Sequence, residues 1–183
     1  MVTNLSRLKK GVFLDRDGVL IETLVKDGKP IAISNISELV VLPLVKESVQ
    51  ELISRDFEVV VVTNQPDVSK GVTSLRQIEL MHKEISNLTG IQHFYVCTHL
   101  QNADCDCRKP RTGLLDQAAQ ELGLDLSKSF LVGDRWSDID AGNNANCNCF
   151  FIDYGYDEKV PSGDFQVVSS LHDAVDKIIQ GGD

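Results

Sequence analysis

Long apolar runs are missing from this 183-residue chain, and no run is long enough to span a bilayer. The stretch "MVTNLSRLKKGVFLDRD" becomes acidic without the uninterrupted apolar segment of a signal peptide. Internal repeats, low-complexity tracts and linker-like shifts of composition are missing too. We therefore expect one domain over residues 1–183, located in the cytoplasm and without a membrane partner.

Positive charge is in short supply, because 18 Lys and Arg face 27 Asp and Glu and leave a net charge of −9. This field repels a phosphate backbone and argues against nucleic acid as a partner. Local cations or a metal can override the field at one site. The expected partner is a small phosphorylated metabolite, and we expect a monomer.

Three common signatures are also absent. The chain has no G-x-x-x-x-G-K-[ST] for nucleotide phosphates, no G-x-G-x-x-G after a strand and no G-x-S-x-G nucleophile elbow. These absences argue against P-loop enzymes, dinucleotide-dependent enzymes and serine hydrolases.

The chain does contain short apolar runs that alternate with amphipathic segments. The runs, at 11–15, 57–64, 94–99, 129–134 and 148–153, are typical of strands buried on both faces. Helices are expected at 44–56, 74–89, 113–123 and 136–146, with a last helix at 170–180 on the edge of the fold. Ser74 and Gln77 have the spacing of a capping box. The alternation predicts an α/β fold with a doubly wound parallel sheet.

Unusual polar residues follow the strands at one predicted edge of this sheet. In doubly wound sheets the binding crevice lies beyond the carboxyl ends of the strands. The residues found there are Asp15 and Asp17, then Thr63 and Asn64, the loop 97–109, and Gly133 with Asp134. Each alone is ordinary in a turn or cap. Their coincidence at successive strand ends favours a shared site.

Asp15 and Asp17 suit a two-step phosphoryl transfer. One carboxylate attacks phosphorus and forms an acyl phosphate, which divides hydrolysis into two easier steps. The other protonates the leaving alcohol and then deprotonates water.

Anions that attack another anion need cations, and Mg²⁺ with oxygen ligands is the natural one. Asp134 completes the predicted metal site, and Asp138, one helical turn beyond, is a second ligand or an orienting group. Thr63 donates to the phosphoryl oxygens, and Lys109 neutralises charge in the transition state.

Four stretches in this order, "DRDGV", "VVTNQ", "CRKP" and "VGDRWSDIDAG", resemble the motifs of the haloacid dehalogenase-like phosphohydrolases. The resemblance covers residues 11 to about 153. It implies Asp15 as nucleophile, Asp17 as general acid/base, and Thr63 and Lys109 as phosphoryl stabilisers. It also implies a Mg²⁺ ion held by Asp15, by the backbone carbonyl of Asp17 and by Asp134.

Many members of that superfamily carry a large cap domain, for which this chain has no room. The intervals between Asp17, Thr63 and Lys109 hold little beyond a helix, a strand and the irregular segment 21–43. We expect that segment to form a hairpin-like flap over the site.

The stretch "CTHLQNADCDCRKP" spaces Cys97, His99, Cys105 and Cys107 as C-x-H-x₅-C-x-C. Three thiolates and an imidazole match a structural Zn²⁺ site, which leaves no open position for catalysis. The expected role of Zn²⁺ is to hold Arg108, Lys109 and Arg111 over the cleft. Scattered reduced thiols are the alternative.

The remaining histidines and cysteines are expected to be ordinary. Strand spacing puts His93 too far from Cys97 to join the zinc site. His82 and His172 are predicted to be surface groups, and Cys147 and Cys149, at the start of the last strand, buried inert thiols.

The zinc loop joined to "RKP" resembles the subgroup that contains D-glycero-D-manno-heptose 1,7-bisphosphate phosphatases and histidinol-phosphate phosphatases. It implies substrate contacts from Asn64, Gln65 and Arg108. Cations in the motif loops favour a bisphosphate, and we expect them to form a rim: Arg16, Lys70, Arg108, Arg111 and Arg135. We therefore predict a sugar phosphatase, with the heptose bisphosphate as substrate and Arg135 as a further substrate contact.

Other functions remain open. The short gap between His99 and Cys105 resembles histidinol phosphatases, and Glu22 or Asp67 offers a carboxylate to an amine. The stretch "NQPDVSKG" also departs from the common subgroup pattern of Asn-Gln, a small residue and Gly. A phospho-accepting receiver domain and a catalytically inactive zinc-binding module are the non-enzymatic alternatives.

Overall fold

The computed structural model describes residues 8–181. Residues 182–183 lie outside the description, as do residues 1–7, which begin the stretch that lacks a signal-peptide pattern. A six-stranded sheet has the order β5-β4-β1-β6-β7-β8, and every neighbouring pair is parallel. Its strands are β1 (Gly11–Leu14), β4 (Glu58–Asn64), β5 (His93–Cys97), β6 (Phe130–Gly133), β7 (Asn148–Ile152) and β8 (Gln166–Val168). The predicted doubly wound parallel sheet is confirmed.

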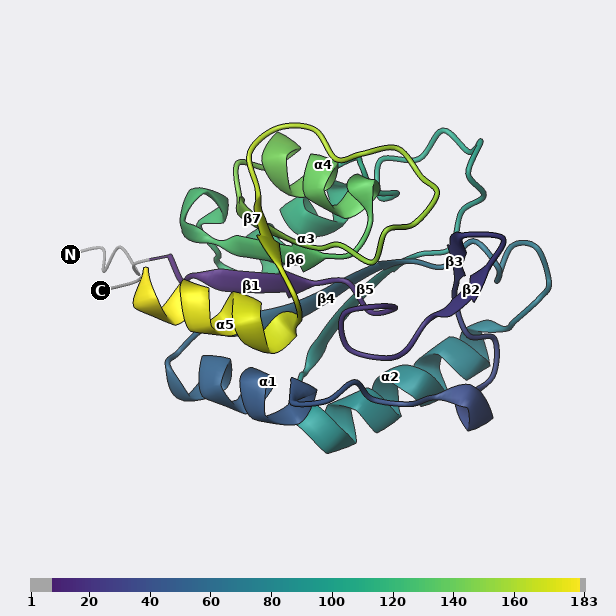
Figure 1. The fold of residues 1–183 in the computed structure, drawn as a ribbon, viewed down its shortest axis with the longest axis horizontal. Coiled ribbons are helices and arrows are strands. Elements are labelled where there is room, and N and C mark those ends of the chain that lie inside the picture. Colours follow the sequence, from purple (N-terminus) through teal and green to yellow (C-terminus); the bar gives the residue numbers. More distant parts are fainter. Residues whose placement is uncertain (1–7, 182–183) are drawn as a thin grey trace, which may run out of the picture.

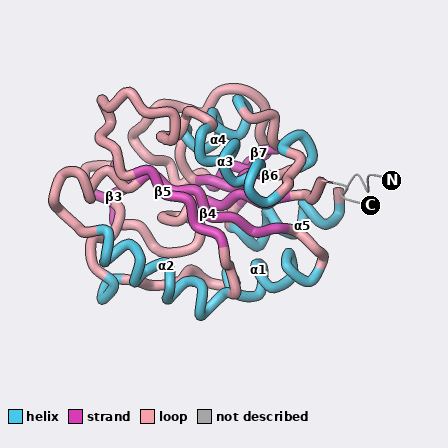
Figure 2. Tube along the Cα trace, turned by 180° about the vertical axis from the view of Figure 1, so that it is seen from behind, coloured by secondary structure: helices cyan, strands magenta, loops and turns pink. Residues whose placement is uncertain are grey.

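Helices cover both faces of the sheet (Figure 1; Figure 2). One face carries α1 (Val45–Ser54), α2 (Leu75–Thr89) and α5 (Leu171–Gln180), and the other α3 (Gly113–Leu122) and α4 (Trp136–Asn144). Each layer encloses its own cluster of buried apolar side chains. The five predicted helices are confirmed, with small shifts of their bounds. None of the helices described has the length and apolar character needed to cross a membrane.

The central strand β1 fixes the start of the site. Val12, Phe13 and Leu14 have no exposed surface. Val12 and Leu14 belong to the cluster under α1 and α2, and Phe13 to the one under α3 and α4. Because side chains alternate across a strand, β1 packs into both apolar clusters. This packing fixes the position of Asp15, which directly follows the strand.

The beginning of α2 shows half of the predicted capping box. The Ser74 hydroxyl accepts from the Gln77 backbone N–H at 3.2 Å. In a full capping box the Gln77 side chain would accept from the Ser74 backbone N–H. It accepts instead from the Ile36 N–H at 3.1 Å. Gln77 thereby ties the 3₁₀ turn η1 (Ile36–Glu38) to α2.

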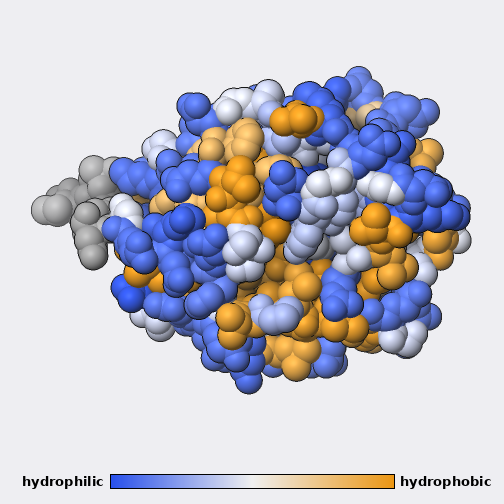
Figure 3. Space-filling view, in the orientation of Figure 1, coloured by the Kyte–Doolittle hydropathy of each residue, from blue (hydrophilic) through white to orange (hydrophobic). Residues whose placement is uncertain are grey.

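The segment 21–43 contains the predicted hairpin. Antiparallel strands β2 (Leu24–Lys26) and β3 (Lys29–Ile31) are joined by Asp27 and Gly28, whose φ angles are 51° and 74°. Positive φ at both central residues is the signature of a type I′ turn. The hairpin stands beside the carboxyl ends of β1 and β4 (Figure 1) and exposes Leu24, Val25 and Ile31. Apolar side chains appear there in orange at the right of Figure 3.

Strand β8 is not predicted from the sequence. It has three residues and pairs with β7, so β7 is not the last strand. Helix α5 contacts β8, as expected for the edge, but also β6 and α1. Leu171, Val175 and Ile178 are therefore part of the main core.

Candidate active site

A pocket of about 40 Å³ lies at the carboxyl edge of the sheet. Six of the predicted site residues line it: Asp15, Asp17, Asn64, Lys109, Arg135 and Asp138. Thr23, Pro30 and Ala32 of the segment 21–43 line it as well, so this segment forms a wall of the pocket as a flap would.

Lys109 connects the carboxylates at the base of the pocket. Its ammonium donates to Asp15 Oδ1 at 2.6 Å, to Asp138 Oδ1 at 2.7 Å and to the Val62 carbonyl at 2.6 Å. An ammonium has three N–H donors, and all three are used. Burial disfavours the charge, but Asp138 and Asp15 outweigh it and raise the pKa of Lys109 to about 12. Lys109 therefore stays positive and acts on a ligand chiefly through its charge.

Asp15, Asp134 and Asp138 form the carboxylate cluster, in which one oxygen of each lies within 4.8 Å of the others. All three are buried. Burial first, and then the charges of Asp15 and Asp138, raise the pKa of Asp134 well above its usual range. Like charges this close call for a cation in addition to Lys109.

Asp134 and Asp138 differ in what their oxygens can still bind. Asp138 accepts from Lys109 with Oδ1 and from the Arg135 backbone N–H with Oδ2 at 3.0 Å, which makes it an orienting group. Asp134 Oδ2 accepts from the Tyr156 hydroxyl at 3.0 Å. Asp134 Oδ1 is buried and has no hydrogen-bond partner among the described residues. A hard cation such as Mg²⁺ fits this free oxygen.

Asp17 is held by donors from two sides. Arg16 donates to both carboxylate oxygens, through Nη2 at 3.0 Å to Oδ1 and through Nε at 3.1 Å to Oδ2. Gln65 Nε2 donates to Asp17 Oδ2 and to Thr63 Oγ1, each at 2.8 Å. Gln65 and Thr63 are both 1% exposed, so they lie beneath the pocket and their contacts here are internal.

Asn64 joins two of the motif loops. Its amide accepts from the Lys109 backbone N–H and donates to the Lys109 carbonyl, each at 3.1 Å. The end of β4 therefore fixes the backbone from which the Lys109 side chain reaches Asp15.

The predicted cationic rim is wrong for Arg16, which is fully buried against Asp17. A guanidinium that leaves water needs a carboxylate partner, and its neighbour supplies one. Three other rim residues are ion-paired: Lys70 with Asp67 at 2.9 Å, Arg111 with Asp104 at 2.8 Å, and Arg135 with Glu158 at 3.0 Å through Nε. Arg108 donates to the His99 carbonyl at 3.4 Å and has no ion pair among the described residues.

Cys97, His99, Cys105 and Cys107 form the thiol cluster, with one ligand atom of each within 4.8 Å of the others. Cys97 Sγ lies 3.8 Å from Cys105 Sγ and 3.5 Å from His99 Nδ1, which is 3.2 Å from Cys107 Sγ. Sulfur ligands about 2.3 Å from a tetrahedral Zn²⁺ lie about 3.8 Å apart. The four side chains predicted from the spacing therefore meet at distances compatible with zinc.

The prediction that His82 is a surface group is wrong. The side chain is buried and stacks on Phe94, with ring centroids 4.6 Å apart. Burial, and then the charge of Arg16, lower the pKa of His82 to about 3. Position 82 lies on the inner face of α2. That His82 lies far from every motif in the sequence says nothing about which face of the helix it occupies.

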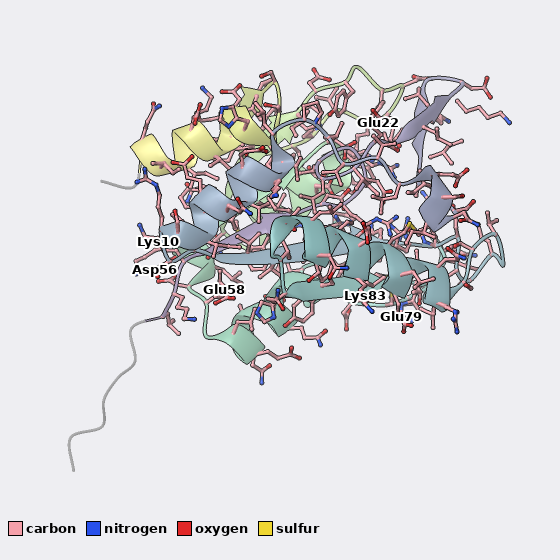
Figure 4. The ribbon with its side chains drawn as sticks, turned by 90° about the horizontal axis from the view of Figure 1, so that it is seen from below. Lys10, Glu22, Asp56, Glu58, Glu79 and Lys83 are labelled. Carbon is pink, nitrogen blue, oxygen red and sulfur yellow. The ribbon has the colours of Figure 1, made fainter. Side chains whose placement is uncertain are left out.

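The other predictions for histidine and cysteine agree with the structure. His172 is partly exposed, and His93 contacts Glu58 at 3.1 Å. Figure 4 shows Glu58 with Lys10 and Asp56 at the opposite end of the molecule from the hairpin. Cys147 and Cys149 are buried, and burial raises the pKa of each to about 12, as expected for inert thiols.

The segment after β7 contributes to the site although no sequence motif marks it. The Tyr154 hydroxyl donates to the Gly18 carbonyl at 2.9 Å, and the Tyr156 hydroxyl to Asp134. With the hairpin these tyrosines enclose a cleft of about 310 Å³, which Glu22 also lines. Figure 4 shows Glu22 at the base of the hairpin. The rule applied to the other strand ends would have named residues 153–156.

Comparison with known proteins adds sequence and fold relatives. A family model described as HAD-hyrolase-like matches residues 106–174. The D-glycero-beta-D-manno-heptose-1,7-bisphosphate 7-phosphatase of Pseudomonas aeruginosa is 32% identical over 149 residues, 79% of this chain and 81% of that protein. The D-glycero-alpha-D-manno-heptose-1,7-bisphosphate 7-phosphatase of Photorhabdus laumondii is 28% identical, over 93% of this chain and 97% of that protein.

The fold has a close counterpart among solved structures. The D,D-heptose 1,7-bisphosphate phosphatase from B. bronchiseptica, crystallised with magnesium and phosphate, superposes with a TM-score of 0.80 at 24% identity. The match covers 94% of this chain and 99% of that chain.

Proposed function

This chain belongs to the haloacid dehalogenase-like phosphohydrolases, and we propose that within this family it removes the 7-phosphate from a D-glycero-D-manno-heptose 1,7-bisphosphate. One observation carries the chemistry: buried Lys109 ties Asp15 to Asp138 beside the free oxygen of Asp134. The names of the relatives support the substrate.

Mg²⁺ fits the carboxylate cluster because Asp134 Oδ1 is buried and has no hydrogen-bond partner within residues 8–181. We assign its ligands to Asp134, Asp15 and the backbone carbonyl of Asp17. When bound, Mg²⁺ would neutralise charge on the phosphoryl group and on its attacking carboxylate.

In the first step, a carboxylate oxygen of Asp15 attacks phosphorus. The bond from phosphorus to the sugar oxygen breaks, and protonated Asp17 gives its proton to that oxygen. Asp15 Oδ1 is bound to Lys109, so the other oxygen is the one available for attack. The products of this step are the free alcohol and a phosphorylated Asp15.

In the second step, Asp17 takes a proton from a water molecule that attacks the phosphorus. The bond to Asp15 breaks, and inorganic phosphate leaves. Arg16 and Gln65 fix the Asp17 carboxylate for both transfers. Lys109 and Thr63 stabilise the charge that is spread over the phosphoryl oxygens.

The pocket admits the phosphoryl group rather than the whole substrate. A cavity needs roughly 10–15 Å³ of volume to hold one water molecule. The pocket of about 40 Å³ therefore suits a group of a few atoms. The sugar would lie outside, between the flap and the loop of Arg108, the cation without an ion pair among the described residues. Asn64, Arg108 and Arg135 remain the proposed substrate contacts, and buried Gln65 would act through its hydrogen bond to Asp17.

We assign structural Zn²⁺ to the thiol cluster, because its four ligands are the protein's own and close the site. Zinc would order the loop that carries Arg108 and Lys109. Three thiols kept free for a metal suit a reducing compartment, so the cytoplasm remains the proposed location. The predictions of one domain and of a monomer remain predictions.

Histidinol phosphate is the second candidate, and Glu22 favours it. That carboxylate lines the cleft beside the tyrosines, where it could bind an amine or imidazole. On this alternative, Glu22→Gln lowers kcat/KM for histidinol phosphate and leaves heptose bisphosphate unaffected.

A side-by-side measurement of kcat/KM with Mg²⁺ decides between the candidates. We expect one anomer of heptose 1,7-bisphosphate to be hydrolysed far faster than histidinol phosphate, and each reaction to stop in EDTA. Faster turnover of histidinol phosphate overturns the proposed substrate. A single stable phosphoryl group per chain without turnover would indicate a receiver domain.

A further inference from the structure

The two carboxylate oxygens of Asp134 have unequal surroundings. Oδ2 accepts from the Tyr156 hydroxyl at 3.0 Å, and this is the hydrogen bond that the carboxylate makes to the described residues. Oδ1 is buried and accepts no hydrogen bond from the part of the chain that the structure describes. The side chain is therefore held at one oxygen and free at the other, and the free one is the oxygen that fits a cation.

The carboxylate is also packed against the loop after β1. A Cβ added to Gly18 would lie 2.0 Å from Asp134 Oδ2. Gly18 has a φ of 82°, so its conformation and its lack of a side chain both leave space for Asp134. The backbone on one side and the Tyr156 hydroxyl define where Oδ2 can lie.

Tyr156 belongs to residues 153–159, the tyrosine loop, which is fastened to the site at several points. The Tyr154 hydroxyl reaches the Gly18 carbonyl, and the two tyrosine rings lie 5.6 Å apart. The Asp157 N–H donates to the Gly28 carbonyl of the hairpin turn at 2.8 Å. Glu158 is ion-paired with Arg135, the residue after Asp134. A loop held at these points can keep a hydroxyl in a fixed position.

We propose that Tyr156 is a positioning residue, whose hydroxyl holds Oδ2 of Asp134 so that Oδ1 faces the cation. The inference rests on the proposed function, in which Asp134 binds Mg²⁺. Groups that hydrogen-bond to metal ligands fix the ligand's orientation, and their loss typically costs about 10- to 100-fold in metal affinity or activity. Without the hydroxyl, Oδ2 loses the hydrogen bond that fixes it, and the carboxylate can rotate.

Tyr156→Phe tests this with titration calorimetry of MgCl₂ into the protein without substrate. We expect Mg²⁺ to bind about 10-fold more weakly than to the wild type. We also expect kcat to recover largely at saturating Mg²⁺, because the hydroxyl acts through the metal site. Tyr95→Phe is the matched control, since the Tyr95 hydroxyl donates to Glu121 at 2.7 Å on the exposed surface. It should bind Mg²⁺ as the wild type does.

Melting temperatures measured in EDTA, where no Mg²⁺ is bound, compare the stability of Tyr156→Phe with that of the wild type. They separate a role in positioning Asp134 from a general role in folding. Equal Mg²⁺ affinity of Tyr156→Phe and wild type overturns the inference, as does a weakening matched by Tyr95→Phe. If Tyr156→Phe does not fold, Glu158→Gln decides, because it loosens the loop at Arg135 and keeps the hydroxyl: weaker Mg²⁺ binding supports the inference, and unchanged binding overturns it. A wild type that binds no Mg²⁺ overturns the proposed function and the inference with it.

Discussion

The carboxylate cluster and the thiol cluster lie at the same sheet edge and are built in opposite ways. Asp15 and Asp134 extend from β1 and β6, Asp138 lies in α4, and all three are buried. Of the thiol cluster, only Cys97 is fixed by a strand and fully buried, while His99 is exposed on its loop. The first cluster has an internal cation, Lys109, bound directly to two of its carboxylates. At the second, Arg108 and Arg111 donate to the backbone carbonyls of His99 and Cys105.

The difference separates a site that is formed before its metal binds from one that the metal must organise. Strands and Lys109 hold the carboxylates, so loss of Mg²⁺ should stop the chemistry and leave the fold. The loop of the thiol cluster has little apolar core, so on the proposed assignment loss of Zn²⁺ should disorder it. Lys109 connects the two clusters. Its side chain binds two carboxylates of the first, and its backbone lies two residues after Cys107 of the second.

The largest effect should come from Asp15→Asn. An amide cannot form the covalent bond to phosphorus, so we expect kcat to fall by roughly 10⁴-fold or more. Zinc content and the far-ultraviolet circular dichroism spectrum should not change. That result would show that the carboxylate cluster can lose its activity without any effect on the thiol cluster or the fold. Asp56→Asn, at the opposite end of the molecule with a φ of 61° that Asn tolerates, is the control and should keep full activity. Substantial turnover by Asp15→Asn contradicts the account.

Lys109→Met should have the next largest effect, on stability. It leaves Asp15 and Asp138 buried without their cation, and breaking a buried pair costs about 3–5 kcal/mol. Urea denaturation measures the loss, and added Mg²⁺ should restore part of it. Lys128→Met removes an exposed pair with Asp125 and should cost far less, because water and salt screen that pair. Equal losses for the two variants would mean that Lys109 does not hold the carboxylate cluster together.

Cys105→Ser should weaken the thiol cluster and act on the chemistry only through the loop. We expect metal analysis to find little zinc, and kcat/KM to drop by about 10- to 100-fold. Cys147→Ser, outside the cluster, should keep its zinc. If Cys105→Ser retains a full equivalent of zinc, the cluster is not the zinc site.

The smallest effect concerns His82, the buried counterpart of exposed His99. The folded protein keeps His82 neutral with a pKa of about 3, whereas the unfolded chain protonates it below its ordinary value of 6.5. The unfolded state thus binds the extra proton, and stability falls as the pH drops below 6.5. Between pH 7 and pH 5 the loss is about 2 kcal/mol. Urea denaturation of His82→Phe at both pH values measures the free energy of unfolding. Between pH 7 and pH 5 the variant should lose about 2 kcal/mol less of it than the wild type does. Equal losses would place His82 in contact with water.

Much of the fold and the site could be predicted because their signals are local. Buried strands are visible in the sequence as apolar runs. The rule that ligands bind beyond the carboxyl ends of parallel strands groups Asp15, Thr63, Lys109 and Asp134 from the sequence alone. Strand β8 escaped because three residues carry no periodicity. Sequence position could not show that Arg16 turns inward to Asp17, or that position 82 faces the core, because both depend on packing between distant segments.

Tyr156 escaped for another reason. Its bond to Asp134 joins residues 22 positions apart, and a tyrosine after a strand has many ordinary explanations. Applied to the end of β7, the rule about strand ends would have named its segment, but no motif marked it. Groups that orient a metal ligand are visible mainly as hydrogen bonds in three dimensions.

Chemical trapping of the phosphorylated enzyme tests the central claim most directly. Borohydride reduces an acyl phosphate of aspartate to homoserine, which peptide mass spectrometry locates. We predict homoserine at position 15, formed only when wild-type enzyme turns over substrate with Mg²⁺ and absent from Asp15→Asn. Steady turnover with an unmodified Asp15, or with the reduced residue elsewhere in the chain, would contradict the account.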